Sequence, residues 1–480
     1  MDLQHWLGRA TEAVQEWADT FGPYRPHPSL DVADDRFAPV FAEFTDRLKD
    51  NYPFFHPHYA GQMLKPPHPA SVVGHLTAML INPNNHALDG GPATAAMERE
   101  AVAQLAAMFG YDTLPDRPSG VGGAPMRSDY APLGHLTTSG TVANLEALFV
   151  ARELHPGRGV AHSADAHYTH GRMCHVLDMT SHPVRTDDRG RMDLDALADV
   201  LETGDVGTVV VTAGTTGLGA VDPVHEILPL AERHGVRVHV DAAYGGFFTL
   251  LAGADGPEGL PPEPWRALAR TDSIVVDPHK HGLQPYGCGA VLFRDPEVGR
   301  FYLHDSPYTY FTSGELHLGE ISLECSRAGA AAAALWLTFR LLPPTPDGLG
   351  KVLAAGRRAA LRWADLIEAS DVLELYQRPQ LDIVTCFPAT EPAALTAVDA
   401  ASARVLADGM AAPDPVFLST LKADRAAFAA RHPKITADAD GARILRSVLM
   451  KPESEDHVEA LHERVERVVA HPSAPKESAR

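Results

Sequence analysis

Between residues 134 and 293 the sequence alternates between short apolar runs and longer helical stretches. Three runs have the length of a β-strand and lead into a glycine, an aspartate or a proline: Val206–Val211, Val236–Val240 and Ser273–Val276. Their apolar residues are mainly continuous rather than alternating, which is typical of strands buried on both faces. The pattern therefore predicts an α/β fold in which helices cover a mostly parallel sheet.

The sequence pattern divides the chain into three predicted units. Residues 1–75 are mainly helical and end in a loop rich in proline, histidine and aromatic residues around Tyr52–Tyr59. Residues 76–345 contain the predicted sheet and end at a proline-rich break after a helix at Ala328–Leu342. Residues 346–480 predict a smaller α+β domain.

The composition excludes several classes of partner. Among 480 residues, 41 Lys and Arg stand against 62 Asp and Glu, a formal net charge of −21. Such a chain repels nucleic acid and anionic membranes, so neither is expected as a partner. The four cysteines show no CxxC spacing, and the first residues lack a signal-peptide pattern. The longest apolar stretch is shorter than the about 20 residues that span a bilayer, so we expect a soluble, cytoplasmic protein.

The third apolar run leads directly into Asp277-Pro-His279-Lys280-His281-Gly282. A lysine forms a Schiff base with a carbonyl group when its amine is deprotonated, and burial and cationic neighbours favour that state. The ends of strands are also where α/β folds bind ligands. The alternative is an ordinary surface lysine that follows a strand.

The second run ends in Asp241, followed by Ala242 and Ala243. A carboxylate in this place can pair with a protonated ring nitrogen, and the small Ala243 lets a flat ring lie close to the backbone. The alternative for Asp241 is a cap of the next helix.

A possible anion site opens the helical stretch that starts near Val142. Ser139, Gly140 and Thr141 precede this helix, where free N–H groups and the positive helix end attract a phosphate. An ordinary N-cap gives the same pattern. The first run ends at Thr212 in a turn of small hydroxylic residues, but no GxGxxG follows, so a nicotinamide cofactor is not expected.

His167 follows Ala164-Asp-Ala and has an imidazole that can stack on a planar ligand. Three further histidines nearby, His162, His170 and His175, raise the alternative of a metal site. There is no HExxH motif and no carboxylate or cysteine at ligand spacing, so no metal is expected.

Together and in this order, these motifs resemble those of group II pyridoxal-5′-phosphate (PLP)-dependent amino-acid decarboxylases, the aromatic-amino-acid/glutamate decarboxylase family. The resemblance runs from about Tyr52 to about Leu461, and Asp277-Pro-His-Lys280 is its most specific motif. Asn82-Pro-Asn-Asn85 and Leu445–Pro452 are further landmarks.

The resemblance implies an aspartate-aminotransferase fold (fold type I), with a large PLP-binding domain, an N-terminal dimerisation segment and a smaller C-terminal domain. It implies a homodimer with sites at the subunit interface. Lys280 then forms the Schiff base with the cofactor, Asp241 pairs with the ring nitrogen and His167 stacks on the ring. The phosphate contacts and the ring face are assigned to Ser139, Gly140, Thr141, His279, Thr212 and Ala243.

The implied activity is the decarboxylation of an L-amino acid to an amine and CO₂. In relatives the segment around Phe54 and Tyr59 forms a side-chain pocket, and these rings favour an aromatic or large substrate, although His58 suits a polar one. Asn85 is a further expected substrate contact. Arg446 interrupts an apolar run, and we expect it to hold a carboxylate or to form an internal salt bridge.

One expected family residue is missing. A loop tyrosine that returns the proton to Cα should lie near residues 314–322, but this segment contains His317 and no tyrosine. Tyr308, Tyr310 and His317 are the substitutes, with an exposed loop position as the alternative for His317. In the family, loss of this tyrosine accompanies aldehyde synthases, which couple decarboxylation to oxidative deamination. An aldehyde synthase and a non-catalytic relative therefore remain as alternative functions.

Borohydride reduction of the PLP-loaded protein should attach the pyridoxyl group to Lys280, because this lysine follows an apolar strand and the Asp-Pro-His motif. Peptide mapping by mass spectrometry would locate the label. Lys280→Arg should carry none. A label on another lysine of the parent protein would contradict the assignment.

Overall fold

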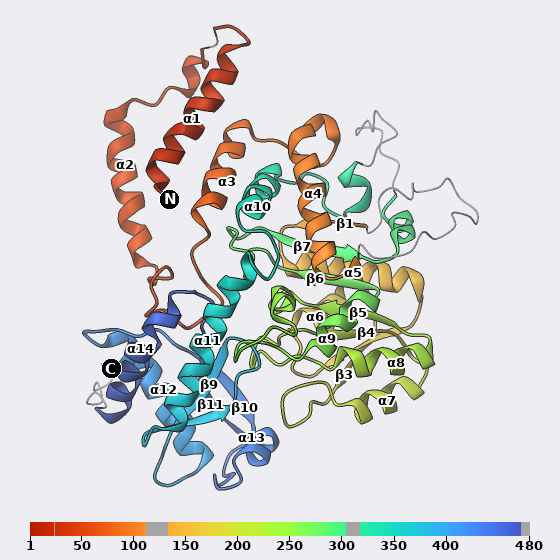
Figure 1. The fold of residues 1–480 in the computed structure, drawn as a ribbon, viewed down its shortest axis with the longest axis vertical. Coiled ribbons are helices and arrows are strands. Elements are labelled where there is room, and N and C mark those ends of the chain that lie inside the picture. The colour runs from red at the N-terminus through yellow and green to blue at the C-terminus, as the bar shows by residue number, and fades with distance from the viewer. Residues whose placement is uncertain (24, 112–132, 304–316, 472–480) are drawn as a thin grey trace.

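The computed structural model describes residues 1–23, 25–111, 133–303 and 317–471. Its largest sheet contains seven strands: β1 (Leu133–Thr137), β2 (Gly159–Ser163), β3 (Ser181–Val184), β4 (Val206–Thr212), β5 (Arg237–Asp241), β6 (Ser273–Val276) and β7 (Gly289–Phe293). Their order across the sheet is β1-β7-β6-β5-β4-β2-β3 (Figure 1). Only β7 runs antiparallel to its neighbours. The predicted α/β fold with a mostly parallel sheet is confirmed.

The apolar runs are continuous because both faces of the sheet are covered. In β6, Val275 packs in a cluster with residues of the helix α5 (Gly140–Leu154). Its neighbours Ile274 and Val276 belong to a second cluster, which includes residues of other helices. The helices around this sheet are α4 (Pro92–Met108), α5, α6 (Thr169–Val176), α7 (Leu194–Glu202), α8 (Val224–His234) and α9 (Pro262–Ala267). Each residue of β4 and β6 is buried as a result.

The C-terminal region forms the predicted smaller α+β unit. Its antiparallel sheet has the order β10-β11-β9-β8 and consists of β8 (Leu373–Gln377), β9 (Ile383–Pro388), β10 (Ser419–Asp424) and β11 (Gly441–Val448). The helices of this region are α11 (Leu349–Glu368), α12 (Leu395–Ala411), α13 (Arg425–Arg431) and α14 (Ser454–Ala470). Figure 1 shows this sheet beside the larger one, with α11 running along both. The exact domain boundaries stay predictions, and α3 (Pro69–Ile81) crosses the one at residue 75.

The N-terminal segment forms the helices α1 (Leu3–Asp19) and α2 (Asp34–Arg47), which project from the rest of the chain (Figure 1). Neither helix buries a single residue. Large apolar side chains are nevertheless exposed on both helices: Trp6, Trp17, Phe37, Val40, Phe41 and Phe44. In the described part of the chain, no helix has the length and apolar character needed to cross a bilayer. The cytoplasmic location stays a prediction.

A buried ion pair joins α4, β1 and α10 (Gly329–Leu341). The Arg327 guanidinium, just before α10, lies 2.5 Å from a carboxylate oxygen of Glu98 on α4 and donates to the Leu136 carbonyl of β1 at 2.9 Å. The second Glu98 oxygen accepts from the Asn85 amide at 2.6 Å. Because the pair is almost fully buried, removal of one partner leaves the other without compensation.

Arg327→Met should lower the free energy of unfolding by about 3–5 kcal/mol, because it leaves the Glu98 carboxylate buried and unpaired. The matched control is Arg340→Met. Arg340 pairs with Glu100, which lies on α4 as Glu98 does, also at 2.5 Å, but both side chains are about half exposed. Loss of the Arg340 side chain should therefore lower the free energy of unfolding by at most about 1 kcal/mol. Urea unfolding would measure both, and equal losses would contradict this ranking.

Candidate active site

Two charged residues lie at the carboxyl ends of β5 and β6. Asp241 is the last residue of β5, and Lys280 lies in the turn that follows β6. The Lys280 Nζ is 3.0 Å from an oxygen of Asp277, and its side chain is 19% exposed. Because β5 and β6 are adjacent and parallel, both residues lie at the same edge of the sheet.

The Asp241 carboxylate is buried but compensated. Burial by itself would raise its pKa, but the hydrogen bond and charge of His170, together with Lys280, hold the pKa well below its ordinary value. The His170 Nε2 lies 2.8 Å from one carboxylate oxygen, and the Ala243 N–H donates to the other at 3.1 Å. From the sequence, His170 is a candidate only as a metal ligand. Its position three residues after His167, the expected ring-stacking residue, was the available indication that it lies near the same site.

Two further histidines flank these charges. His167 is half-buried, and burial is the main cause that lowers its pKa. The charge of Lys280 lowers the pKa of His167 further, whereas that of Asp241 raises it. His279 is buried, its Nδ1 lies 2.8 Å from the Cys288 carbonyl oxygen, and its ring lies 4.7 Å from that of Tyr286. Burial also lowers the pKa of His279.

The N-terminal end of α5 reaches the same edge. Ser139 caps this helix by accepting from the Val142 N–H at 3.3 Å. Gly140 approaches Asp277 so closely that a Cβ at this position would lie 2.6 Å from a carboxylate oxygen. Glycine is therefore required at position 140, because Asp277 occupies the space of any side chain there. Thr141 follows in the first turn and is exposed, so the open helix end can receive an anion.

Thr212 and Ala243 complete the wall beside Asp241. Thr212 pairs with Asp241 across β4 and β5, and its hydroxyl oxygen is buried without a hydrogen-bond partner. The Ala243 carbonyl accepts from the Asp277 N–H at 3.3 Å. A buried hydroxyl without a partner is costly in a folded protein, so the Thr212 side chain suits a polar ligand atom.

A network that sequence analysis missed connects the lysine turn to the smaller sheet. Asp382, between β8 and β9, accepts a short hydrogen bond from the Tyr244 hydroxyl, and its other oxygen lies 2.9 Å from the Nε2 of His281. The His281 Nδ1 lies 2.9 Å from the Tyr244 carbonyl oxygen. Burial would raise the pKa of Asp382, but the His281 ring and the Tyr244 hydroxyl hold it below its ordinary value. Asp382 lies 101 residues after His281, so no local sequence pattern predicts this contact.

Three of the residues expected to contact the substrate have different surroundings in the structure. Phe54 packs edge-on against Tyr59 at 4.9 Å between ring centroids. His58 is half-buried, with its pKa lowered by burial and by the charge of Arg464. Arg446 donates to the Gly217 carbonyl at 3.2 Å, and its terminal Nη2 is buried without a partner. Within the described ranges no carboxylate forms an ion pair with Arg446, so the structure does not contain the internal salt bridge that was its alternative.

Two other expected residues have structural contacts. The Asn85 amide donates to Glu98, and its oxygen accepts from the Thr94 hydroxyl at 2.6 Å. His317 is only 1% exposed, and its Nδ1 accepts from the Leu88 N–H at 3.1 Å while it caps a short 3₁₀ helix, residues 318–321. The alternative of an exposed loop histidine is therefore wrong. The other two expected proton donors, Tyr308 and Tyr310, lie outside the described residues.

Comparison with known proteins identifies the family of this chain. A family model described as the pyridoxal-dependent decarboxylase conserved domain matches residues 29–389. The chain belongs to this decarboxylase family. PLP is accordingly its cofactor. The family resemblance predicted from the motifs is confirmed.

Individual relatives agree with this assignment. The chain is 31% identical to a probable L-tyrosine/L-aspartate decarboxylase of Methanopyrus kandleri over 58% of this chain and 68% of the relative. It is 28% identical to an L-tyrosine decarboxylase of Enterococcus faecium over 70% and 68%, respectively. The crystal structure of Oryza sativa TDC with PLP and tryptamine is similar in fold, with a TM-score of 0.77, 18% identity and 98% coverage of both chains. The predicted fold type is confirmed.

The residues at the sheet edge fit PLP. The site offers a lysine amine, a carboxylate kept charged at a neighbouring strand end, an open helix N-terminus and the unpartnered Thr212 hydroxyl. These groups correspond to the aldehyde, ring nitrogen, phosphate and polar ring substituents of the cofactor. The described residues contain no group of three His, Cys, Asp or Glu side chains arranged to hold a metal ion.

His170→Phe should raise the pKa of Asp241, because burial then acts on this carboxyl without the hydrogen bond that opposes it. A carboxylate with a raised pKa is protonated at higher pH, so the acid limb of the kcat/KM profile should move upward by about 1–3 pH units.

The matched control is His162→Phe. The His162 ring lies 5.9 Å from that of His170, and its two nitrogens contact Ser163 and Ser181. This control should leave the acid limb in place. An unchanged limb in His170→Phe would show that His170 does not set the protonation state of Asp241.

Proposed function

We propose that the chain is a PLP-dependent carboxy-lyase that converts an L-amino acid to its amine and CO₂. The observation that carries this proposal is the pair of groups at the ends of β5 and β6: Lys280, whose amine is partly exposed, and Asp241, whose carboxylate is kept charged by His170. Family membership supports amino-acid decarboxylation, and this pair supplies the two groups that the cofactor requires.

The chain's own residues would have distinct roles. When bound, PLP withdraws electrons from the substrate Cα and thereby weakens its bond to the carboxylate. Lys280 would hold the cofactor covalently through Nζ. Asp241 would keep a proton on the ring nitrogen, and His170 would keep Asp241 ionised. His167 would hold the ring plane, which decides which bond at Cα breaks.

The remaining cofactor contacts would come from three segments. The first turn of α5 would bind the phosphate through its free N–H groups and the hydroxyls of Ser139 and Thr141. His279, buried beside Asp277, would lie close to this phosphate. Gly140 and Ala243 would leave room for the cofactor, and Thr212 would bind a polar ring substituent.

Two classes of substrate have support. The rings of Phe54 and Tyr59 favour an aromatic amino acid, and the relative from Enterococcus faecium is an L-tyrosine decarboxylase. Buried cations favour an acidic amino acid, and the relative from Methanopyrus kandleri is a probable L-tyrosine/L-aspartate decarboxylase. Arg446 and Lys451 lie beside Tyr59, and no carboxylate of the described residues pairs with either. Burial lowers the pKa of Lys451 to about 8.

The proton donor to Cα decides between the amine and the aldehyde product. His317, Tyr308 and Tyr310 remain the candidates, and His317 would have to leave its contact with Leu88 to act. A reaction that lacks an efficient donor would favour the aldehyde synthase activity. The amine is our proposed product.

We also propose that two copies of this chain form a homodimer with a site at each interface, in the cytoplasm. The exposed apolar residues of α1 and α2 support this assembly, because isolated helices without a buried face are unstable in water. A second copy would cover these faces. The segment 1–75 would then be the dimerisation segment.

An assay in air of a panel of L-amino acids should detect equal amounts of amine and CO₂ and no hydrogen peroxide. L-tyrosine, L-phenylalanine, L-tryptophan, L-aspartate and L-glutamate separate the aromatic from the acidic class. Arg446→Lys should raise KM for the accepted substrate about tenfold, because its guanidinium holds a carboxylate.

Arg443→Lys is the matched control on the same strand, since Arg443 is half exposed and pairs with Asp399. It should leave KM unchanged. Aldehyde and peroxide in place of amine would identify an aldehyde synthase, and no product with any amino acid would favour a non-catalytic relative.

Sedimentation should give a particle of two chains. Phe41→Asp on α2 should weaken the association at least about tenfold, because it places a charge on a face that the partner covers. The control on the same helix is Glu43→Gln, whose exposed side chain should tolerate the change. A monomeric parent protein would contradict the proposed assembly.

A further inference from the structure

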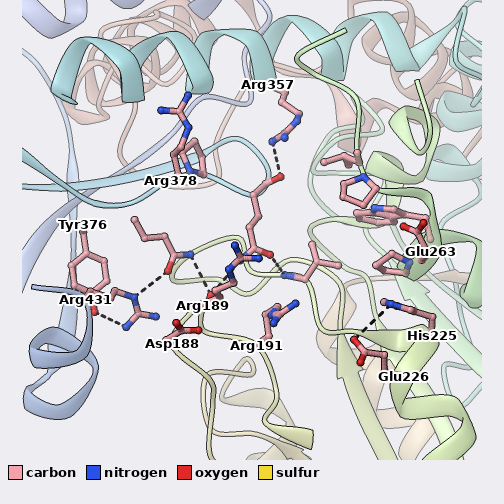
Figure 2. Close-up of a pocket in the computed structure, with 18 residues that line it drawn as sticks. Asp188, Arg189, Arg191, His225, Glu226, Glu263, Arg357, Tyr376, Arg378 and Arg431 are labelled. Atoms are coloured by element: carbon pink, nitrogen blue, oxygen red, sulfur yellow. Dashed lines mark hydrogen bonds and ion pairs between the residues drawn. The ribbon is translucent and has the colours of Figure 1, made fainter. Parts of the chain in front are cut away.

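A cavity with a volume of about 750 Å³ lies apart from the lysine turn, between the two sheets. Its walls come from the segment after β3, the start of α8, α9, α11, the β8–β9 loop and α13. Figure 2 shows five arginines around it: Arg189, Arg191, Arg357, Arg378 and Arg431. This concentration of cations is unexpected in a chain with a net charge of −21.

Three of these arginines are already engaged. Arg191 pairs with Asp187 at 2.7 Å. Arg378 pairs with two carboxylates of α11 at 2.7 and 2.8 Å. Arg357 is buried and donates to the backbone carbonyls of residues 258, 380 and 381. Their charges or donors therefore have partners within the protein.

Arg189 and Arg431, like Arg357, form no ion pair with a carboxylate within the part of the chain that the structure describes. Arg431 donates from Nη1 to the Tyr376 hydroxyl at 3.2 Å and to the Ala427 carbonyl at 3.0 Å, which leaves its Nη2 to meet a ligand. Gln377 connects the two arginines. Its amide oxygen accepts from the Arg431 Nε at 3.2 Å, and its amide nitrogen donates to the backbone carbonyl of Arg189 at 3.3 Å. The Arg431 guanidinium also lies 5.0 Å from the centre of the Tyr376 ring. This ring and Gln377 fix the direction of the Arg431 side chain.

Acidic side chains also line the cavity, and one of them, Asp188, lies on the same side as Arg189 and Arg431 (Figure 2). Glu226 and Glu263 lie across the cavity from Arg189 and Arg431 in Figure 2. Glu226 has a histidine neighbour, His225, at 3.7 Å. A ligand in this cavity would therefore place an anionic group toward the arginines and a neutral or cationic part toward the glutamates.

We propose that this cavity binds a small molecule through an anionic group, a phosphate or a carboxylate, held between Arg189 and Arg431. A guanidinium binds either group with two parallel hydrogen bonds. The two arginines come from different parts of the fold, since Arg189 follows β3 of the large sheet and Arg431 ends α13 beside the small one. A bound anion would bridge these two parts. The proposal does not depend on the identity of the amino-acid substrate.

The test is calorimetric titration of the PLP-saturated protein at constant ionic strength, with inorganic phosphate in one arm and succinate in the other. We expect saturable binding of at least one probe at one site per chain. Arg189→Gln and Arg431→Gln should each weaken it at least about tenfold, since each removes charge-assisted hydrogen bonds. The two arms distinguish a phosphate from a carboxylate ligand.

Arg425→Gln is the matched control, because Arg425 lies on the same helix as Arg431 but pairs with Asp440 outside the cavity. It should retain the parent affinity within about twofold. Arg189 is exposed, so its replacement tests the site without disturbing the core. Absence of saturable binding overturns the proposal, as does parent affinity in both variants or an equal loss in Arg425→Gln. Binding that PLP saturation abolishes belongs to the cofactor's phosphate site and also overturns it.

Discussion

The buried carboxylate of Asp241 is the constraint on which the rest of the large sheet depends. A charge in that position is tolerated only because His170 lies 2.8 Å away and a backbone N–H is directed at the other oxygen. His170 is positioned by α6, and Ala243 by the turn after β5. The parallel pairing of β5 with β6 then brings the lysine turn to the same edge. The need to compensate one buried charge thus accounts for the positions of His170 and the Ala243 N–H at this edge of the sheet.

Much of this could be predicted from the sequence, because the information was local. The continuous apolar runs indicated the doubly covered sheet, and the Asp277-Pro-His279-Lys280 motif indicated the cofactor. What could not be predicted depends on contacts between distant segments. Asp382 contacts His281 across 101 residues, and the His317 ring accepts from the Leu88 N–H across 229 residues. Neither partner carries a pattern that identifies the other. Asn85 belongs to a motif that could be recognised in the sequence. Only the structure shows why this position needs an amide, which donates to Glu98 and accepts from Thr94.

Charge is distributed unevenly in this molecule. The overall acidity disfavours polyanionic partners, but within the described part of the chain positive side chains are concentrated at two places. One is the group around Tyr59, with Arg446 and Lys451, and the other is the cavity with Arg189 and Arg431. Overall net charge describes what a large partner meets at a distance, whereas a small ligand responds to the nearest few groups. Both descriptions hold for the same chain.

The Tyr244–Asp382–His281 network has a consequence for how the protein unfolds. Asp382 belongs to the connection between two strands of the small sheet, whereas its two partners flank the ends of β5 and β6. If the small sheet separated from the large one, a carboxylate, a phenol and an imidazole would all lose their partners in one event. The two sheets are therefore coupled into one cooperative unit at this point. Loss of the small sheet's packing would remove the Asp382 carboxylate from His281, the residue next to Lys280, so the lysine turn depends in part on the C-terminal region.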